Sequence, residues 1–260
     1  MYRRQLLFIL VFLFSSMFLM AQDSITTFSN VSDFEIDPLG NCYYLSKDDL
    51  IKTNAQGKEL VRYSMKNLGR PAAIDVNNPM RVLVFYASQA VIRILDNNLI
   101  DQSEIDLRAL GIVQPKAMAG TPDQGIWIFD EISASLIKVD SRLNSTAYSV
   151  DLTQLTGRRP NPKRLIANQN WLVMLDQQGI ILFDQFGTKV KSIPVEKPIS
   201  TLQLSENKLL YEEEGQIMTY NMSFNVFQKE NYTLPKNAVK AYFSEGKCWY
   251  LLNETLYFPQ

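Results

Sequence analysis

The side chains that could do chemistry in this 260-residue chain are carboxylates, cations and two cysteines, because the sequence contains no histidine. That absence excludes Ser-His-Asp and Cys-His catalysis and every histidine-containing zinc or iron site. Carboxylate chemistry such as glycoside hydrolysis or calcium binding stays open, since it needs only oxygen groups. The sequence therefore assigns no catalytic residue, no metal ligand and no cofactor, and it favours a non-enzymatic protein.

The sharpest local charge cluster is the segment 157–164, where Arg158, Arg159, Lys163 and Arg164 surround two prolines. Four cations on a loop stiffened by proline would suit an acidic protein partner or a lipid headgroup. A solvated loop that proline holds extended is the alternative, and the sequence leaves it open. We take these four residues as the candidate partner-binding site.

The elements that must position these residues come from a recurring pattern, in which an apolar residue is followed by Asp or Asn and a short turn. The Asx residues stand at positions 54, 96, 140, 184 and 221, so that successive copies are 42, 44, 44 and 37 residues apart. Short β segments with such a period are typical of a β-propeller. We expect each Asx side chain to bond the backbone two residues on and so to stabilise its turn.

Each repeat divides into four short strands, and the second strand is the most apolar. A continuous apolar run between polar turns predicts a strand that is covered on both faces, as the middle strands of stacked blades are. The runs predict an all-β chain, a six-bladed β-propeller with four-stranded blades. They are 42–45, 82–85, 126–129, 171–174, 209–211 and 248–251.

The sixth repeat lacks a fourth strand before the sequence reaches Gln260. The β-branched segment Ser24–Ser29 precedes the first inner strand and has no other repeat to join. We expect this segment to complete the sixth blade and close the ring, which would also protect an exposed strand edge. One propeller domain over residues 22–260 follows.

The architecture resembles six-bladed propellers of the NHL-repeat or quinoprotein-like kind over residues 23–260, through its repeats rather than through a diagnostic motif. Similar lactonases gather acidic and amide groups from several blades around one divalent metal. The charges on the inner strands here are mixed in sign, so that a convergent carboxylate set is not visible. These charged residues are Asp33, Glu35, Asp37, Asp75, Lys116, Lys163, Arg164 and Lys240.

Three further groups have both a chemical and a structural interpretation. Cys42 and Cys248 fall at equivalent positions of neighbouring blades, roughly 10 Å apart, and a disulfide needs Cα atoms within about 7 Å. We therefore expect two buried thiols and no bridge.

Trp127, Trp171 and Trp249 recur on second strands, which favours packing between blades over a carbohydrate platform. The run 212–214 of three glutamates is expected to be a solvated turn, because alternating strand residues cannot converge on a cation.

The N-terminal residues predict export. Arg3 and Arg4 precede an apolar stretch over residues 6–20, and Ala21 offers a small residue at the cleavage point, which is the layout of a signal peptide over residues 1–21. An uncleaved membrane anchor is the alternative, although the stretch is shorter than the roughly 20 residues that a spanning helix needs.

The net charge of −1 argues against nucleic acid as a partner, because phosphate binding needs a clustered basic surface. We expect an exported scaffold, periplasmic, associated with the outer envelope or secreted, that holds an envelope-associated protein partner on one rim. Contact with a membrane would be peripheral. A hydrolase or lactonase that uses carboxylates or calcium, and a receptor for a small ligand or glycan, remain alternatives.

Overall fold

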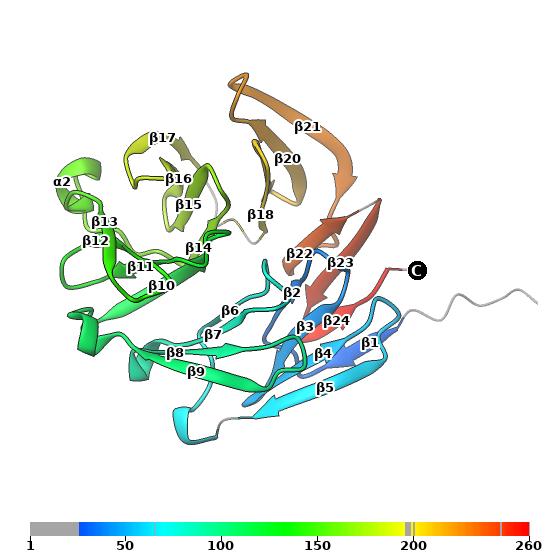
Figure 1. Cartoon of the computed structure of the whole chain (residues 1–260). Coiled ribbons are helices and arrows are strands. Elements are labelled where there is room, and N and C mark those ends of the chain that lie inside the picture. The colour runs from blue at the N-terminus through cyan, green and yellow to red at the C-terminus, as the bar shows by residue number, and fades with distance from the viewer. Residues whose placement is uncertain (1–25, 65, 196–198, 200, 245, 260) are drawn as a thin grey trace, which may run out of the picture.

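A computed structural model describes residues 26–64, 66–195, 199, 201–244 and 246–259 (Figure 1). The signal peptide predicted over residues 1–21 lies outside the described residues. Within the described ranges, no helix has the length and apolar character needed to cross a membrane.

The described residues form six antiparallel sheets of four strands each, arranged as a ring of blades (Figure 1). The predicted fold class, an all-β six-bladed propeller, is confirmed. The strands of the first three blades are β2 (Asp33–Ile36), β3 (Cys42–Ser46), β4 (Asp49–Thr53) and β5 (Glu59–Ser64); β6 (Ala73–Asp75), β7 (Val82–Tyr86), β8 (Val91–Leu95) and β9 (Asp101–Asp106); and β10 (Pro115–Gly120), β11 (Ile126–Asp130), β12 (Ser135–Val139) and β13 (Ser145–Tyr148).

Blades 4 and 5 repeat this order, and blade 6 takes its fourth strand from the beginning of the described chain. Their strands are β14 (Arg164–Ala167), β15 (Trp171–Asp176), β16 (Gly179–Asp184) and β17 (Lys189–Pro194); β18 (Leu202–Ser205), β19 (Lys208–Glu213), β20 (Gln216–Asn221) and β21 (Val226–Thr233); and β22 (Ala238–Ser244), β23 (Lys247–Leu252), β24 (Thr255–Tyr257) and β1 (Thr27–Ser29).

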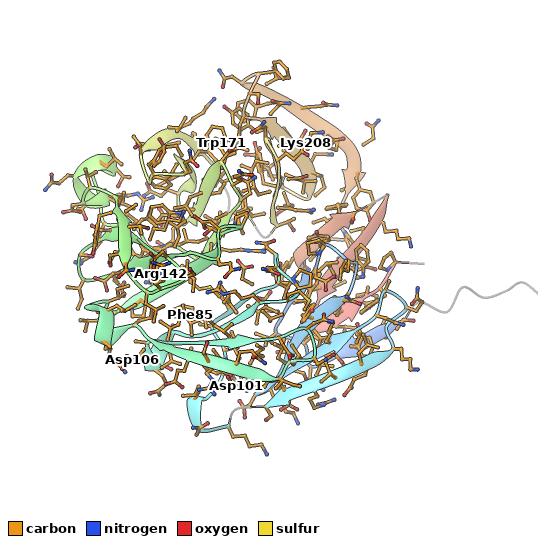
Figure 2. The ribbon with its side chains drawn as sticks, viewed as in Figure 1. Phe85, Asp101, Asp106, Arg142, Trp171 and Lys208 are labelled. Carbon is orange, nitrogen blue, oxygen red and sulfur yellow. The ribbon has the colours of Figure 1, made fainter. Side chains whose placement is uncertain are left out.

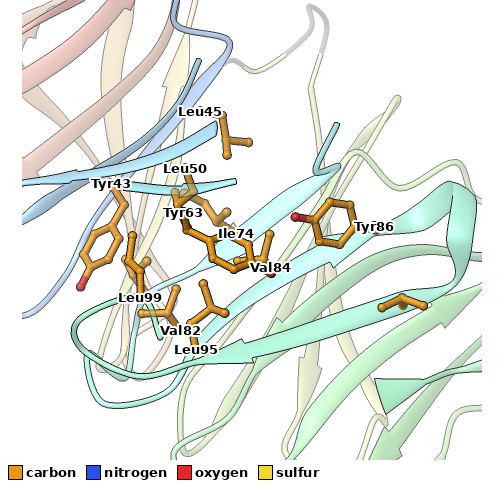
Figure 3. Packing of buried hydrophobic residues seen from close by; sticks show 12 residues of the cluster. Tyr43, Leu45, Leu50, Tyr63, Ile74, Val82, Val84, Tyr86, Leu95 and Leu99 are labelled. Atoms are coloured by element: carbon orange, nitrogen blue, oxygen red, sulfur yellow. The ribbon is translucent and has the colours of Figure 1, made fainter. Parts of the chain in front are cut away.

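Apolar side chains hold the ring together, because every pair of neighbouring blades shares a buried cluster. Strands β7 and β11 are buried at every position, as the continuous apolar runs predict. Figure 3 shows the cluster between blades 1 and 2, where Tyr43 and Leu50 face Val82 and Val84. Figure 2 shows how the side chains fill the space between the sheets.

The Asx turns form as predicted between the third and fourth strands of blades 1 to 5. Each Asx side chain accepts a hydrogen bond from the backbone nitrogen two residues on, which fixes the turn. These side chains are Asn54, Asp96, Asp140, Asp184 and Asn221.

Strand β1 pairs antiparallel with β24, with Phe28 opposite Leu256. The ring of Phe28 stacks on Tyr44 of blade 1 at 5.1 Å between centroids, and it meets Phe258 at 5.4 Å. The beginning of the described chain thus contacts both blade 6 and blade 1.

The antiparallel order gives the ring two faces. The first hairpin of every blade and the third hairpins of blades 1 to 5 lie on one, which we call the first-turn face. The second hairpins and the connections between blades lie on the other, which we call the linker face. The described helical turns belong to the linker face and are η1 (Lys66–Leu68), η2 (Ala87–Gln89), η3 (Arg108–Leu110) and α2 (Leu152–Thr156).

Candidate functional site

The inner strands of all six blades surround an axial cavity of about 400 Å³. Most residues that line it are small or apolar, and charged or amide side chains reach into it from each blade. These polar side chains are Asp33 and Glu35 from β2, Asp75 from β6, Lys116 from β10, Arg164 from β14, Gln203 from β18 and Lys240 from β22.

Ion pairs occupy much of the axial cavity. A carboxylate oxygen of Glu35 accepts hydrogen bonds from Arg164 of blade 4 and, at 2.6 Å, from Lys240 of blade 6. The ammonium of Lys240 also donates to Asp33 at 2.7 Å. Blades 1 and 4 are opposite one another in a ring of six, so that the pair of Glu35 and Arg164 spans the axis.

Asp75 uses its carboxylate differently from the ion-paired acids. It accepts hydrogen bonds from the backbone nitrogen of Gly120 at 2.8 Å and from that of Asn77 at 3.0 Å. Burial in the cavity raises the pKa of Asp75 and outweighs these hydrogen bonds, which act to lower it. Burial likewise lowers the pKa of the neighbouring Arg81 guanidinium.

The axial carboxylates are therefore committed to cations or backbone amides and do not converge on an open position. Across the described residues, no group of three or more cysteine, aspartate and glutamate side chains is placed to hold a metal ion. Because Glu35 and Asp33 share Lys240, a metal would have to displace ion pairs that already neutralise both acids.

The structure places the four predicted partner-binding cations in different surroundings. Arg158 pairs with the buried Asp176 on β15, and Arg159 donates to the backbone oxygen of Ile132 at 2.8 Å. Lys163 is exposed at the cavity wall and has no ion-pair partner within the described residues. Arg164 belongs to the axial network. The four do not form one open basic site.

Sequence reasoning missed Asp176 as the partner of Arg158, and it also missed the role of Glu131. Glu131 accepts hydrogen bonds from Lys116 and Gln114, at 2.9 and 2.8 Å, and so joins the second hairpin of blade 3 to its inner strand. Both acids end a second strand, or directly follow one, on the linker face. A charged residue at the end of a second strand is the sequence signal that would have indicated a contact with the connection that leads into the same blade.

Both cysteines are free, but the expectation of two buried thiols holds only for Cys42, because Cys248 is half-buried. Cys42 packs between blades 6 and 1, whereas Cys248 packs between blades 5 and 6. Each thiol thus faces the preceding blade, and burial raises the pKa of both thiols, which favours their protonated form.

The tryptophans also lie between blades. Trp127 and Trp249 are buried, and the indole nitrogen of Trp171 donates to Asn207 of blade 5 at 2.8 Å. The three glutamates of residues 212–214 do not share one environment, since Glu212 is buried and accepts a hydrogen bond from the Gly215 nitrogen. The expectation of a fully solvated turn is wrong for Glu212.

The fold is that of a six-bladed β-propeller, and comparisons with known proteins assign no narrower family within that class. No family model and no curated protein matches the chain. The WD40 domain of Neurospora crassa Pan2 aligns with a TM-score of 0.64 at 9% identity, over 88% of this chain and 88% of that one.

Two other solved structures show the same likeness. A catalytically inactive histidine-to-alanine variant of virginiamycin B lyase from Staphylococcus aureus, with quinupristin, aligns with a TM-score of 0.61 at 12% identity, over 88% of this chain and 80% of that one. A chain of the mitotic checkpoint complex aligns with a TM-score of 0.60 at 12% identity, over 92% and 75%. Identities this low show the fold alone.

Proposed function

We propose that this chain is an exported, non-enzymatic scaffold that holds a protein partner on its linker face. The observation that carries the proposal is an exposed patch over blade 3, formed by Val113, Ile132 and Arg159, which we call the blade-3 patch. Val113 is 54% exposed and Ile132 is 57% exposed. Apolar side chains beside an arginine are the composition that protein interfaces favour at their centre.

The loops that carry the blade-3 patch are fixed to one another. Arg159 donates to the backbone oxygens of Glu131 and Ile132, which holds the connection to blade 4 against the second hairpin of blade 3. The backbone nitrogen of Glu131 donates to the carbonyl of Gln114 at 2.9 Å, which brings Val113 beside that hairpin. A surface held in place in this way loses little entropy when a partner binds.

Two observations support a non-enzymatic role. The axial carboxylates of Asp33 and Glu35 are neutralised by Arg164 and Lys240, which makes these two acids poor candidates for acid and base catalysis. A virginiamycin B lyase, which has a similar fold, is described as catalytically inactive when a histidine is changed to alanine. This chain contains no histidine at all, so it does not carry that chemistry.

Export is the second part of the proposal, and it rests on the basic and apolar pattern of residues 1–21. Fractionation of cells that express the chain with a C-terminal tag tests it. We expect the tagged protein outside the cytoplasm, with a mature N-terminus at Gln22. Recovery of the unprocessed chain from the cytoplasm would reject export and leave the binding proposal to its own test.

Site-specific photocrosslinking in the native cell tests the blade-3 patch. A photoreactive amino acid at Ile132 is expected to give a discrete protein adduct that mass spectrometry identifies. The matched control carries the same amino acid at Met80, which is 69% exposed on the first-turn face. The same adduct from both positions, or none from Ile132, would refute the assignment of this face.

A further inference from the structure

A second cavity, of about 350 Å³, opens between blades 3 and 4 on the first-turn face. Its walls come from the first hairpin of blade 3, the first hairpin of blade 4 and the Asx turn of blade 4. Polar side chains predominate among the residues that line it, which are Thr121, Pro122, Asp123, Trp127, Lys138, Asn168, Gln169 and Gln185.

The internal repeat supplies an equivalent place between blades 1 and 2. Trp127 stands opposite Lys138 across β11 and β12, as Tyr43 stands opposite Lys52 across β3 and β4. Gln185 directly follows the Asx residue of blade 4, as Asn97 directly follows that of blade 2. An aromatic ring, a lysine and an amide from the next blade therefore recur in both places.

Between blades 1 and 2 the lysine closes this place. Lys52 reaches across to blade 2, where its ammonium donates to the backbone oxygen of Asn97 at 2.8 Å and to the side-chain oxygen of Asn97. The ammonium lies 5.1 Å from the centre of the Tyr43 ring, and Lys52 is only 3% exposed. The amide of Asn97 and the aromatic ring are thereby occupied by a group of the protein itself.

Between blades 3 and 4 the lysine turns back to its own blade. Lys138 donates to Asp123 at 2.7 Å, and Thr121 donates to the same carboxylate. Burial acts to raise the pKa of Asp123, but the hydrogen bonds from Lys138 and Thr121 prevail and lower it, so that the ion pair is kept at neutral pH. Within the described residues, the side-chain amide of Gln185 is left without a hydrogen-bond partner and the cavity stays open.

We propose that this cavity binds a neutral hexose unit. The lining charges of Asp123 and Lys138 cancel, which disfavours a charged ligand of either sign. The amides of Gln169 and Gln185 each offer donors and an acceptor, and sugar hydroxyls act in both senses. Pro122 supplies an apolar surface for the C–H side of a sugar ring. The volume lies within the range of small-ligand sites.

Saturation-transfer NMR with the intact chain tests this site, with the methyl glycosides of glucose, mannose and galactose and with N-acetylglucosamine as probes. At least one probe is expected to receive saturation at its ring protons and to bind with millimolar affinity. The changes Gln185→Ala and Gln169→Ala each remove hydrogen bonds to the sugar, and each is expected to weaken binding about tenfold.

The matched control is Gln154→Ala, which changes an exposed glutamine of α2 on the linker face and is expected to leave binding unchanged. Circular dichroism establishes that each variant is folded. The proposal is overturned if no probe receives saturation, or if the control weakens binding as much as Gln185→Ala. Displacement of the sugar by inorganic phosphate or putrescine would also overturn it, because the site would then select charge.

Discussion

Individual side chains in this propeller owe their roles to partners that are distant in sequence. Arg158 shows this most clearly, because its neighbours Arg159, Lys163 and Arg164 indicate a basic docking loop whereas its contact is the buried Asp176. Asp176 also accepts a hydrogen bond from the Asn161 nitrogen at 2.7 Å. Arg158 therefore neutralises a carboxylate inside the fold, and it fixes the connection between blades 3 and 4.

Replacement of Arg158 by alanine is expected to lower the free energy of unfolding by about 1–3 kcal/mol, since it leaves a buried carboxylate without its cation. Urea denaturation followed by circular dichroism measures this loss. The control is Arg159→Ala, which removes only exposed hydrogen bonds to backbone oxygens and is expected to cost less than about 1 kcal/mol. Equal losses in the two variants would contradict the role assigned to Arg158.

The buried carboxyl of Asp75 should make the free energy of unfolding depend on pH. Its pKa is raised in the folded chain, so the folded state binds more protons than the unfolded state above about pH 4. The contribution of this carboxyl to the free energy of unfolding therefore falls as the pH rises through the raised pKa. In Asp75→Asn that dependence is absent, so the wild type should lose stability relative to the variant between pH 4 and 7. Urea denaturation across that range measures the difference, and a difference that does not change with pH would refute the prediction.

At the scale of the strand, the sequence was a good guide wherever burial is continuous. The apolar runs at Val82 and Ile126 predict β7 and β11 because a middle strand is covered on both faces and admits few polar side chains. The Asx turns were equally predictable from the sequence, since an Asx side chain accepts a hydrogen bond from the backbone nitrogen two residues further on. Edge strands such as β21 carry mostly exposed residues, and their burial pattern has no comparable signal.

Strand β1 is short, but for an element of its length we expect its loss to lower the stability of the molecule most. Deletion of residues 24–29 removes the partner of β24 and the ring of Phe28 from its place against Tyr44 and Phe258. We expect a loss of about 2–4 kcal/mol and a tendency to aggregate through the exposed edge of β24. Chemical denaturation and light scattering measure the two effects.

The change Phe28→Ala separates the two contributions of β1. It keeps the backbone pairing and removes only the ring, so it is expected to lose stability without the aggregation. If the deletion variant stays monomeric and as stable as the wild type, β1 has no part in holding blade 6.

At the scale of the whole molecule, the candidate site was the least predictable part. The sequence predicts charged residues of both signs on the inner strands, and the axial cavity contains them with the exception of Asp37. Asp37 lies instead in the first hairpin of blade 1, where it accepts hydrogen bonds from the Leu39 and Asn41 nitrogens. Which of the charged residues pair could not be predicted, because Glu35 and Arg164 are separated by 129 positions and only the closed ring brings them together. Pairing across an axis depends on the number of blades and on the register of each inner strand, and no local spacing encodes either.

The pairing of Glu35 with Arg164 should contribute to the free energy of unfolding of the whole ring. The change Glu35→Gln keeps the shape of the side chain but removes the charge that both Arg164 and Lys240 contact. Arg164 then loses its carboxylate partner, while Lys240 keeps only Asp33. We expect a loss of about 2–4 kcal/mol in the free energy of unfolding, because breaking a buried network leaves an uncompensated charge. The double change Glu35→Gln with Arg164→Gln removes one of those cations and should recover part of the loss. Denaturation of the wild type, of each single variant and of the double variant, followed both by tryptophan fluorescence and by circular dichroism, gives the four free energies that the comparison needs. If the single variant unfolds with the wild type, or the double variant loses the full sum of the two single changes, the axial pair does not link opposite blades.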